Sequence, residues 1–346
     1  MSSNPIQIAY VLTSNCEDTY TDLNLISLWS LQETNPTAQV ILVCDCETVQ
    51  AIKNSQHRIE QEVDKIISVD VPANSPGFRN RHLKTNLRHY VEGPFLYLDA
   101  DTLIRDDLSP IFNTKASLAG VPNHSGTGSP SEIPSSELKI YEKLGWSLPS
   151  NYYVNGGVLF FADHPEVYEF CNLWHQKWIE CSSTIGKHLD QPSLNSAIDD
   201  TQIHFTWLDH PYNAQVHARP HTAWDARIWH IYLSEPHPSP KNVLAQALVQ
   251  YRQGTSMSSH DIAKLCQRPH PWLINNPLHW LAIRNLKKKS SILGPNRWER
   301  LWLADQYSSS FLQIYHKLRN QIINKLRSVK LFTGKLNSLF SLSNFK

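Results

Sequence analysis

The sequence predicts an α/β protein built on a mostly parallel central sheet, with a mainly helical C-terminal extension. Short apolar runs such as residues 40–44 alternate with segments of helical periodicity along the first hundred residues. These runs are nearly continuous in apolar residues, which is typical of strands that helices cover on both faces. With 346 residues and 41% hydrophobic residues, the chain is large enough for such a domain and an appendage.

The expected elements begin in a β-α-β-α-β order and become less regular further along the chain. The expected strands are residues 6–12, 40–44, 65–69, 95–98 and 154–161, and the expected helices are residues 23–31, 47–59 and 166–180. Residues 122–134 are rich in Ser, Gly and Pro and are expected to form a surface loop or lid. Trp174 and Trp178 lie at helical spacing and are expected in the core. Residues 204–229 are rich in loops and aromatic residues, and helical periodicity dominates beyond residue 240.

Cysteine spacing and hydropathy argue against a disulfide-rich, zinc-framework or membrane-spanning protein. The six cysteines form no C-x-x-C pair, which argues against a zinc or disulfide framework, and Cys44 is expected at the end of a buried strand. The N-terminus lacks a basic segment followed by an apolar one, and no apolar run reaches 18 residues. We therefore expect a cytoplasmic protein.

The net charge of +1 hides an uneven distribution along the chain. Residues 284–346 hold 13 Lys and Arg against two acidic residues, whereas the preceding residues hold 19 basic and 29 acidic ones. Within residues 306–346, Phe311, Ile314 and Leu318 belong to a helical apolar stripe interspersed with basic residues. We expect this tail to contact an anionic membrane at its inner face, although an amphipathic helix docked on the acidic body gives the same pattern. Nucleic acid is not an expected partner, because no binding motif accompanies the charge.

Two carboxylates follow the expected strand at residues 95–98, in the segment Asp99-Ala100-Asp101. In an extended chain alternate side chains share one face, so both carboxylates can point into one small space. Such a pair resists joint ionisation unless a proton is shared or a cation binds, and its hard oxygen ligands suit Mg²⁺ or Mn²⁺. Ligands of parallel sheets bind beyond the carboxyl ends of the strands, where this motif is expected. The alternative is an ordinary acidic turn.

Several other segments occur in an order that resembles a known family. They are Leu12-Thr13-Ser14-Asn15 with Tyr20, His82-Leu83-Lys84-Thr85-Asn86, Tyr153-Val154-Asn155-Gly156-Gly157, His188-Leu189-Asp190-Gln191, Trp207-Leu208-Asp209-His210-Pro211-Tyr212-Asn213 and Ala226-Arg227-Ile228-Trp229-His230. Together with Asp99-Ala100-Asp101 they resemble glycosyltransferase family 8, which includes glycogenin and bacterial lipopolysaccharide galactosyltransferases. The resemblance covers residues 6–232 and implies the Rossmann-like GT-A fold of nucleotide-diphospho-sugar transferases. It also implies retaining transfer of a hexose from a UDP-sugar to a glycan, lipid-linked or other hydroxyl acceptor.

The resemblance implies a catalytic GT-A domain over residues 1–240 and a role for each matched residue. Helical periodicity predicts an extension over residues 241–305, and the charge distribution marks residues 306–346 as a basic tail. The expected metal ligands for Mn²⁺ or Mg²⁺ are Asp99, Asp101 and His230. The expected donor-binding residues are Leu12, Thr13, Asn15, Tyr20, Arg81, Lys84, Ala100, Asn155, Gly156 and Gly157. The expected catalytic residues are Asp190, which orients the sugar, and Gln191, which lies near the face where the acceptor enters.

Each segment also has a purely structural interpretation. Asn15 or Asp18 can cap the helix that follows the first strand, and Asp190 can cap a helix that has Pro192 in its first turn. The paired glycines can form a bulge in a strand. For Arg79, which precedes the matched Lys84, a solvated surface charge is the favoured interpretation.

One part of the family pattern is missing. Family members commonly continue from the metal-binding histidine as H-x-x-G-x-x-K-P-W, whose lysine contacts the diphosphate. Here His230 is followed by Ile231-Tyr232-Leu233-Ser234-Glu235-Pro236, and His237 or Lys241 would have to supply the cation. This departure leaves open a catalytically degenerate sugar-nucleotide-binding protein, and the basic tail leaves open a membrane-surface scaffold.

Overall fold

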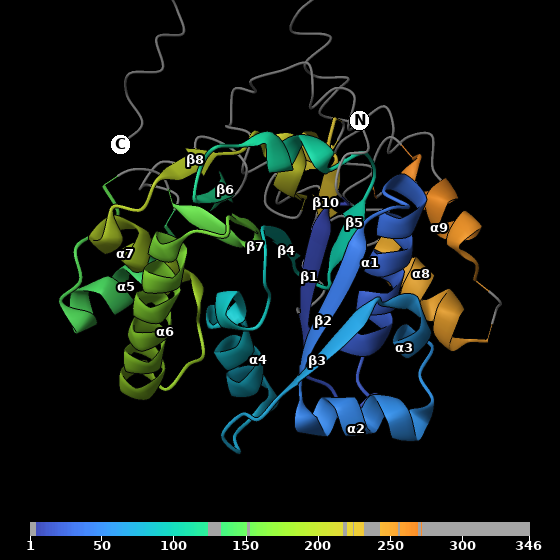
Figure 1. The fold of residues 1–346 in the computed structure, drawn as a ribbon, viewed down its shortest axis with the longest axis horizontal. Helices are drawn as coiled ribbons and strands as arrows, with labels where there is room; N and C mark the ends of the chain where they lie inside the picture. Colours follow the sequence, from blue (N-terminus) through green and yellow to red (C-terminus); the bar gives the residue numbers. More distant parts are fainter. Residues whose placement is uncertain are drawn as a thin grey trace, which may run out of the picture. The chain divides into compact units, whose positions relative to one another are not determined.

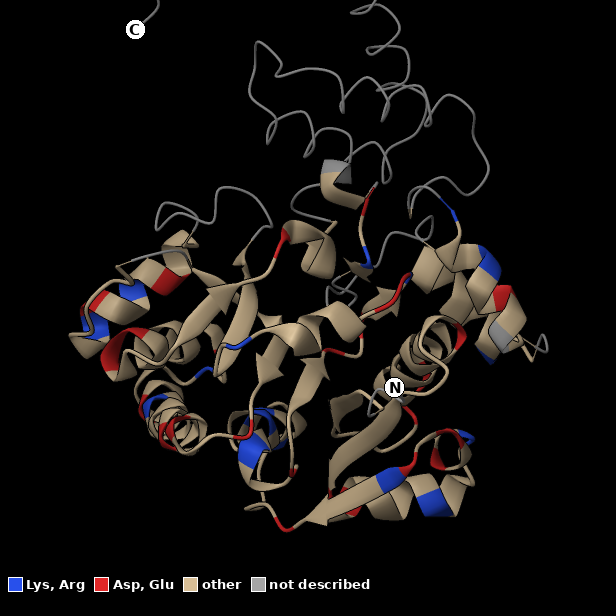
Figure 2. Ribbon diagram, turned by 45° about the horizontal axis from the view of Figure 1, so that its top comes forward, with Lys and Arg blue, Asp and Glu red and all other residues tan. Residues whose placement is uncertain are grey.

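The computed structural model describes residues 5–123, 133–150, 153–216, 220–223, 225–231, 243–254, 257–268 and 271. Contacts divide the chain into residues 1–291 and residues 292–346, and every described residue belongs to the first unit. The basic tail, most of the predicted lid and the possible replacement cations His237 and Lys241 therefore lie outside the described residues. The excess of basic residues from 284 onward also lies outside them, and on the described helices acidic and basic residues are interspersed (Figure 2).

A seven-stranded sheet forms the centre of the first unit, in the order β3-β2-β1-β4-β7-β6-β8 (Figure 1). Its strands are β1 Gln7–Leu12, β2 Gln39–Asp45, β3 Lys65–Val69, β4 Phe95–Leu98, β6 Leu118–Pro122, β7 Val154–Phe161 and β8 Phe205–Trp207. The four strands from β3 to β4 are parallel, and β8 is parallel to β6. The predicted mostly parallel sheet is thus confirmed.

Strand β7 is antiparallel to both of its neighbours, β4 and β6. An antiparallel strand presents its first residues where its parallel neighbours end. In the β4–β7 register Leu98 is opposite Val158, so Asn155, Gly156 and Gly157 lie beside the carboxyl end of β4. The Asp99 N–H donates to the Gly157 carbonyl at 2.9 Å, which fastens the two segments together.

A second, three-stranded sheet contains β5 Thr102–Ile104, β9 Ala214–Gln215 and β10 Ile228–His230. Strand β10 lies between the other two, antiparallel to β5 and parallel to β9. Its register places His230 opposite Thr102, the residue that follows Asp101. This small sheet therefore brings a histidine from far along the chain to the paired aspartates.

Helices flank the central sheet (Figure 1). The α-helices are α1 Tyr20–Thr34, α2 Cys46–Ser55, α3 Ile59–Glu62, α4 Pro76–Thr85, α5 Ser135–Leu144, α6 Pro165–Ile185, α7 Gln191–Thr201, α8 Val243–Arg252 and α9 Ser259–Cys266. Short 3₁₀ helices cover Leu87–His89, Ser109–Asn113, His210–Asn213 and Pro220–Ala223. The single helix predicted for residues 47–59 is wrong, because Gln56 adopts a left-handed conformation with φ of 50° and separates α2 from α3.

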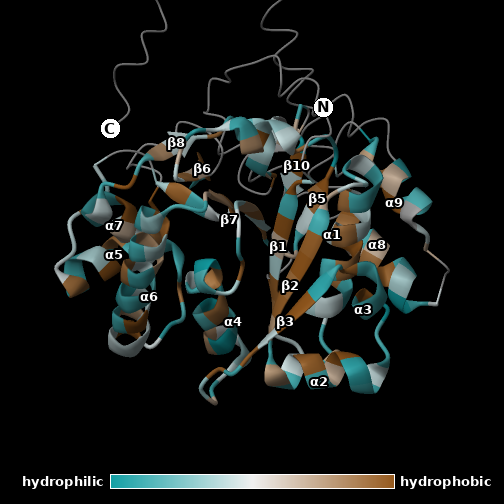
Figure 3. Cartoon of the chain, in the orientation of Figure 1, coloured by the Kyte–Doolittle hydropathy of each residue, from teal (hydrophilic) through white to brown (hydrophobic). Residues whose placement is uncertain are grey.

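Alternate residues of the central strands face opposite sides of the sheet, as strand geometry requires. Ala9 and Val11 of β1 pack into one core with residues of α4 and α6, whereas the Tyr10 hydroxyl reaches Ser27 of α1 at 3.0 Å on the other side. Figure 3 shows the apolar composition of β1 and β2 that this double coverage requires. Trp174 and Trp178 of α6 are fully buried, which confirms their prediction as core residues.

Helices α8 and α9 pack against α1. They fall within the range predicted as a helical extension, the rest of which is mostly outside the described residues. In the described parts of the chain no helix combines the length and the apolar character needed to cross a bilayer. All six cysteines are free thiols in the described residues.

Replacing Trp174 with Ala should lower the free energy of unfolding by about 3–5 kcal/mol, because the change removes a fully buried indole and leaves a cavity. It also removes the Trp174 Nε1–H bond to the Asp190 carbonyl, 3.2 Å long. Urea denaturation measures the change. Ile179→Ala is the control on the same helix, because Ile179 is 38% exposed; equal losses in both variants would contradict the packing described for α6.

Candidate metal and sugar-nucleotide site

A cavity of about 410 Å³ lies beyond the carboxyl ends of β1 and β4. Of the predicted site residues, Leu12, Thr13, Tyr20, Arg81, Lys84, Asp99, Ala100, Asp101, Asn155, Gly156, Gly157, Asp190, Gln191 and His230 line it. They come from the end of β1, the loop after it and the start of α1, from α4 and the β4–β5 turn, and from β7, the N-terminus of α7 and β10. The position agrees with the general rule that ligands of open α/β sheets bind at the carboxyl ends of the strands.

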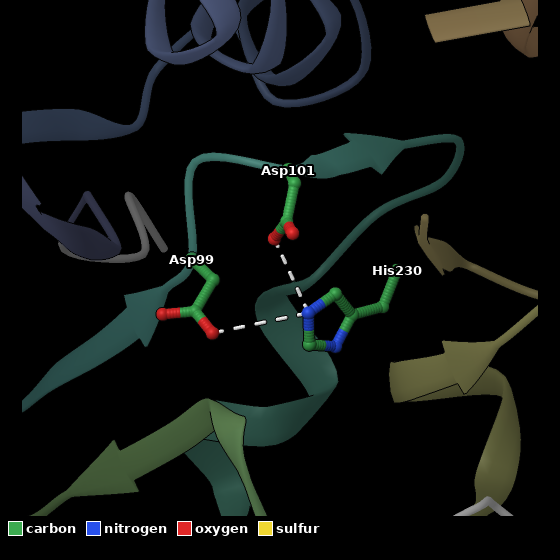
Figure 4. Close-up of side chains that lie close together, drawn as sticks. All are labelled: Asp99, Asp101 and His230. Atoms are coloured by element: carbon green, nitrogen blue, oxygen red, sulfur yellow. Dashed lines mark ion pairs between the residues drawn. The ribbon is translucent and has the colours of Figure 1, made fainter. Parts of the chain in front are cut away.

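Asp99, Asp101 and His230 converge on one point of this cavity (Figure 4). The His230 Nε2 atom is 3.2 Å from an Asp101 carboxylate oxygen and 3.8 Å from Asp99 Oδ2. One ligand atom from each residue lies within 4.8 Å of the other two. The imidazole is almost fully buried, whereas both carboxylates remain partly open to the cavity.

The neighbours of His230 fix the orientation of its ring. Its Nδ1 is 3.0 Å from Asn213 Oδ1, and the Asn213 amide donates in turn to Asn155 Oδ1 at 2.9 Å. With the amide orientation assigned in this way, His230 Nδ1–H is the donor and the Nε2 lone pair faces the two carboxylates. Metal-binding histidines are typically held by such a bond at the other ring nitrogen. Two carboxylate oxygens and one imidazole nitrogen are a donor set that fits Mn²⁺.

Asp99 is oriented by two neighbours of its own. Its Oδ1 atom accepts a short hydrogen bond from the Tyr97 hydroxyl and lies 3.2 Å from the Lys84 ammonium. Burial, and then the charge of Asp99, raise the pKa of Tyr97 well above its usual value, so the phenol stays neutral and donates. The second carboxylate oxygen, Oδ2, is consequently the one that faces His230.

The backbone of β7 closes one side of this ligand set at Gly157. A Cβ atom at residue 157 would lie 2.8 Å from His230 Nδ1 and 2.9 Å from Asp99 Oδ2, closer than side chains approach one another. Glycine is therefore required here by the approach of the strand to the ligands. The β6–β7 register also shifts between Gly120 and Pro122, opposite this segment, so the predicted irregularity in the strand is present as well.

Asp190 forms a second charged cluster beside the first. Its two carboxylate oxygens pair with Arg81 Nε and with Lys84 Nζ, each at 2.9 Å. Burial alone would raise the pKa of Asp190, but the positive charges of Arg81 and Lys84 outweigh it and hold the pKa well below its usual range. Asp190 precedes α7, and a proline lies in the first turn as predicted, but its carboxylate does not cap the helix. It faces the cations of α4 instead.

Gln191 lies at the start of α7, next to the cavity wall formed by β7. Its Oε1 atom is 3.4 Å from both the Asn155 amide nitrogen and the Gly156 backbone nitrogen. Both predicted catalytic residues, Asp190 and Gln191, thus line the same wall as the predicted donor-binding residues Asn155 and Gly156.

Asn15 is not among the residues that line the cavity. Its side chain is exposed, and its Oδ1 accepts hydrogen bonds from the backbone N–H groups of Glu17 and Asp18 at 3.0 and 3.2 Å. Asn15 thus closes a local turn ahead of α1 and does not cap that helix, and its role in donor binding stays a prediction.

The interpretation of Arg79 as a solvated surface charge is wrong. The side chain is buried, its Nε lies 3.3 Å from Asp45 Oδ2, and its guanidinium also pairs with Glu47. Asp45 ends β2 as a buried carboxylate, and a buried carboxylate requires a counter-charge or hydrogen bonds. Arg79 supplies that charge.

Sequence patterns did not identify every residue that lines or supports the cavity. Asp18, Asn80, His188 and Tyr97 also line it, and Asn213 supports His230 from outside. Tyr97 lies two residues before Asp99, a spacing that puts both side chains on one face of an extended chain and could have revealed it. Asn213 gives no such local signal, since its partner is 17 residues away.

No protein-family model matches the sequence, and no curated protein sequence matches it significantly. Comparison with solved structures finds glycosyltransferases. The galactosyltransferase LgtC, solved with donor and acceptor sugar analogues, is 17% identical with a TM-score of 0.47, covering 80% of this chain and 100% of LgtC. GlyE of Streptococcus pneumoniae TIGR4 is 16% identical with a TM-score of 0.49, covering 76% of this chain and 63% of GlyE. Mouse xyloside xylosyltransferase 1 is 13% identical with a TM-score of 0.44, covering 68% of this chain and 99% of that protein.

Adjacent glycines of β7 give a matched pair of variants for the metal site. Gly157→Ala should weaken Mn²⁺ binding at least about 10-fold, because the added methyl group displaces His230 and Asp99. Gly156→Ala should leave Mn²⁺ binding close to wild type, since its Cβ would meet Asp190, Leu194 and Lys84 only at 3.5 Å. Calorimetric titration with Mn²⁺ measures both. Equal affinities in the two variants would contradict the placement of the ligands against residue 157.

Proposed function

We propose that this chain is a retaining GT-A glycosyltransferase that transfers a hexose from a UDP-sugar to a hydroxyl group of a glycan or lipid-linked acceptor, with Mn²⁺ bound. The observation that carries the proposal is the convergence of Asp99, Asp101 and His230 in a cavity that also contains Lys84 and Asp190. A metal-binding set alone fits many activities. This set lies beside the ionised carboxylate of Asp190, which can accept hydrogen bonds from hydroxyl groups, and the buried ammonium of Lys84, which can pair with phosphate. The position therefore favours a substrate that has both groups.

The metal would be held by Asp99, Asp101 and His230 and would supply neutralisation of the charge that develops on the leaving diphosphate. Among the described residues Lys84 is well placed to add to that effect, because its ammonium lies 3.2 Å from Asp99. Its ammonium pairs with Asp99 and Asp190, and the side chain is only 3% exposed. These two contacts orient the ammonium toward the proposed metal ligands.

The sugar would occupy the wall formed by β7 and the start of α7. Asp190 stays ionised at neutral pH and can accept hydrogen bonds from sugar hydroxyls, while Arg81 and Lys84 fix its orientation. Positive charge develops at the anomeric carbon as the bond to the diphosphate breaks. Gln191 presents a neutral amide on this wall, which can position the reacting groups but cannot take up a proton. Retention of configuration follows from the family resemblance.

The nucleotide would occupy the part of the cavity next to Tyr20. The size of the cavity and the exposure of the Tyr20 ring favour this placement. The volume of about 410 Å³ falls in the range of sites for small molecules. Tyr20 lines the cavity with 46% of its surface exposed, so its ring is available to stack on a base. Thr13 lines the same region, held by a hydrogen bond to the Pro76 carbonyl at 3.1 Å.

Release of UDP from a panel of UDP-sugars, with Mn²⁺ or with EDTA, tests the proposal. We expect metal-dependent release with one donor, and a fall of at least about 100-fold for Asp101→Asn, because the amide removes one charged ligand of the metal. Asp70→Asn is the control, since Asp70 is exposed and does not line the cavity. Donor binding without hydrolysis or transfer would favour the degenerate binding protein, and an active Asp101→Asn variant would contradict the metal site.

A further inference from the structure

The loop between β1 and α1 forms one side of the cavity but is held mainly by its own short-range hydrogen bonds. Asp18, which lines the cavity, accepts from the Ser14 hydroxyl and the Tyr20 N–H through one oxygen, at 2.8 and 2.9 Å. Cys16, within the loop, has φ of 64°, a conformation that residues with a side chain rarely adopt. A loop of this kind needs an external contact to keep one conformation.

The first part of the loop has such contacts, from the Ser14 N–H to Thr48 Oγ1 at 2.8 Å and from Thr13 to the Pro76 carbonyl. Its last part is held by Arg252, the last residue of α8, more than 230 residues further along the chain. One guanidinium nitrogen donates a short hydrogen bond to the Asp18 carbonyl, and Nε lies 2.5 Å from Asp22 Oδ2 in the first turn of α1. A single planar group therefore ties the end of the loop to the start of the helix.

Asp22 is itself held from two sides. Its other carboxylate oxygen lies 3.1 Å from His57 Nε2, and the carboxylate is only 12% exposed. Burial would raise the pKa of Asp22, but the bonds and charges of His57 and Arg252 lower it, so the carboxylate is ionised at neutral pH. Tyr251 fixes the adjoining turn of α8, with its ring packed edge-on against Trp29 of α1 at 5.8 Å.

We propose that Arg252 is a positioning residue for the nucleotide of the donor, acting through the loop of residues 13–20 and not through the metal site. The proposal rests on the proposed function, because it takes the ligand beside Asp18 and Tyr20 to be the nucleotide. It makes α8 part of the donor site although none of the residues of α8 lines the cavity. It also gives a role to a contact between Arg252 and a loop that lies more than 230 residues earlier in the chain.

The test measures two affinities of the full chain, for Mn²⁺ alone and for UDP in the presence of Mn²⁺. Arg252→Ala should weaken UDP binding about tenfold, the loss expected when hydrogen bonds to a charged group are removed, while Mn²⁺ binding stays unchanged. Arg252→Lys should give an intermediate UDP affinity, because an ammonium can keep the charge but not both bonds.

Arg58→Ala is the matched control. Arg58 is 53% exposed and lies over the ring of Trp29 at 4.8 Å, so it shares the packing around α1 but does not line the cavity. We expect it to bind UDP like wild type. Unchanged UDP binding by Arg252→Ala would overturn the inference. So would an equal loss of Mn²⁺ and UDP affinity, which would show a general loss of structure. If the wild-type chain does not bind UDP at all, the proposed function itself fails.

Discussion

The arrangement around the cavity depends on the need to keep two carboxylates next to each other at a partly buried position. Asp99 and Asp101 are two residues apart on the turn after β4, and like charges at that distance repel. Lys84 on the outer oxygen of Asp99 meets part of this constraint, and the metal proposed to bind Asp99, Asp101 and His230 would supply the remaining positive charge. This constraint explains the position of three features. They are the three-stranded sheet that carries His230, the glycines of β7, and the basic residues of α4.

Lys84 connects the proposed metal ligands with the proposed sugar-binding wall. Its ammonium contacts Asp99 and Asp190 together, so each carboxylate shares the same counter-charge. Asp190 also pairs with Arg81, so the two carboxylates and the two basic side chains of this buried cluster have no net charge. A change in the charge of either carboxylate therefore affects the other through Lys84, and in the proposed function this would link binding of the diphosphate with orientation of the sugar.

Much of the fold could be predicted because its strands are continuous apolar runs that end in polar residues. Strands β3, β4 and β7 begin and end at the predicted residues, and the carboxylate pair follows from the two-residue period of a strand. His230 was identified by the order of motifs alone, since 17 histidines give no composition signal. The long-range contacts gave no local pattern: Asn213 on His230, Arg79 on Asp45 and Arg252 on Asp22 depend on how distant elements pack. The left-handed break at Gln56 was missed for a different reason, because the apolar periodicity continues across it.

The central claim is that Asp99, Asp101 and His230 together bind a divalent metal that also binds the diphosphate of the nucleotide. The most direct measurement is anomalous diffraction at the manganese edge from crystals of the full chain grown with MnCl₂ and UDP. The account predicts one strong peak within about 2.5 Å of a carboxylate oxygen of each aspartate and of His230 Nε2, with the diphosphate of UDP also bound to it. Bound UDP with no peak between these three residues, or a peak elsewhere in the cavity, would contradict it.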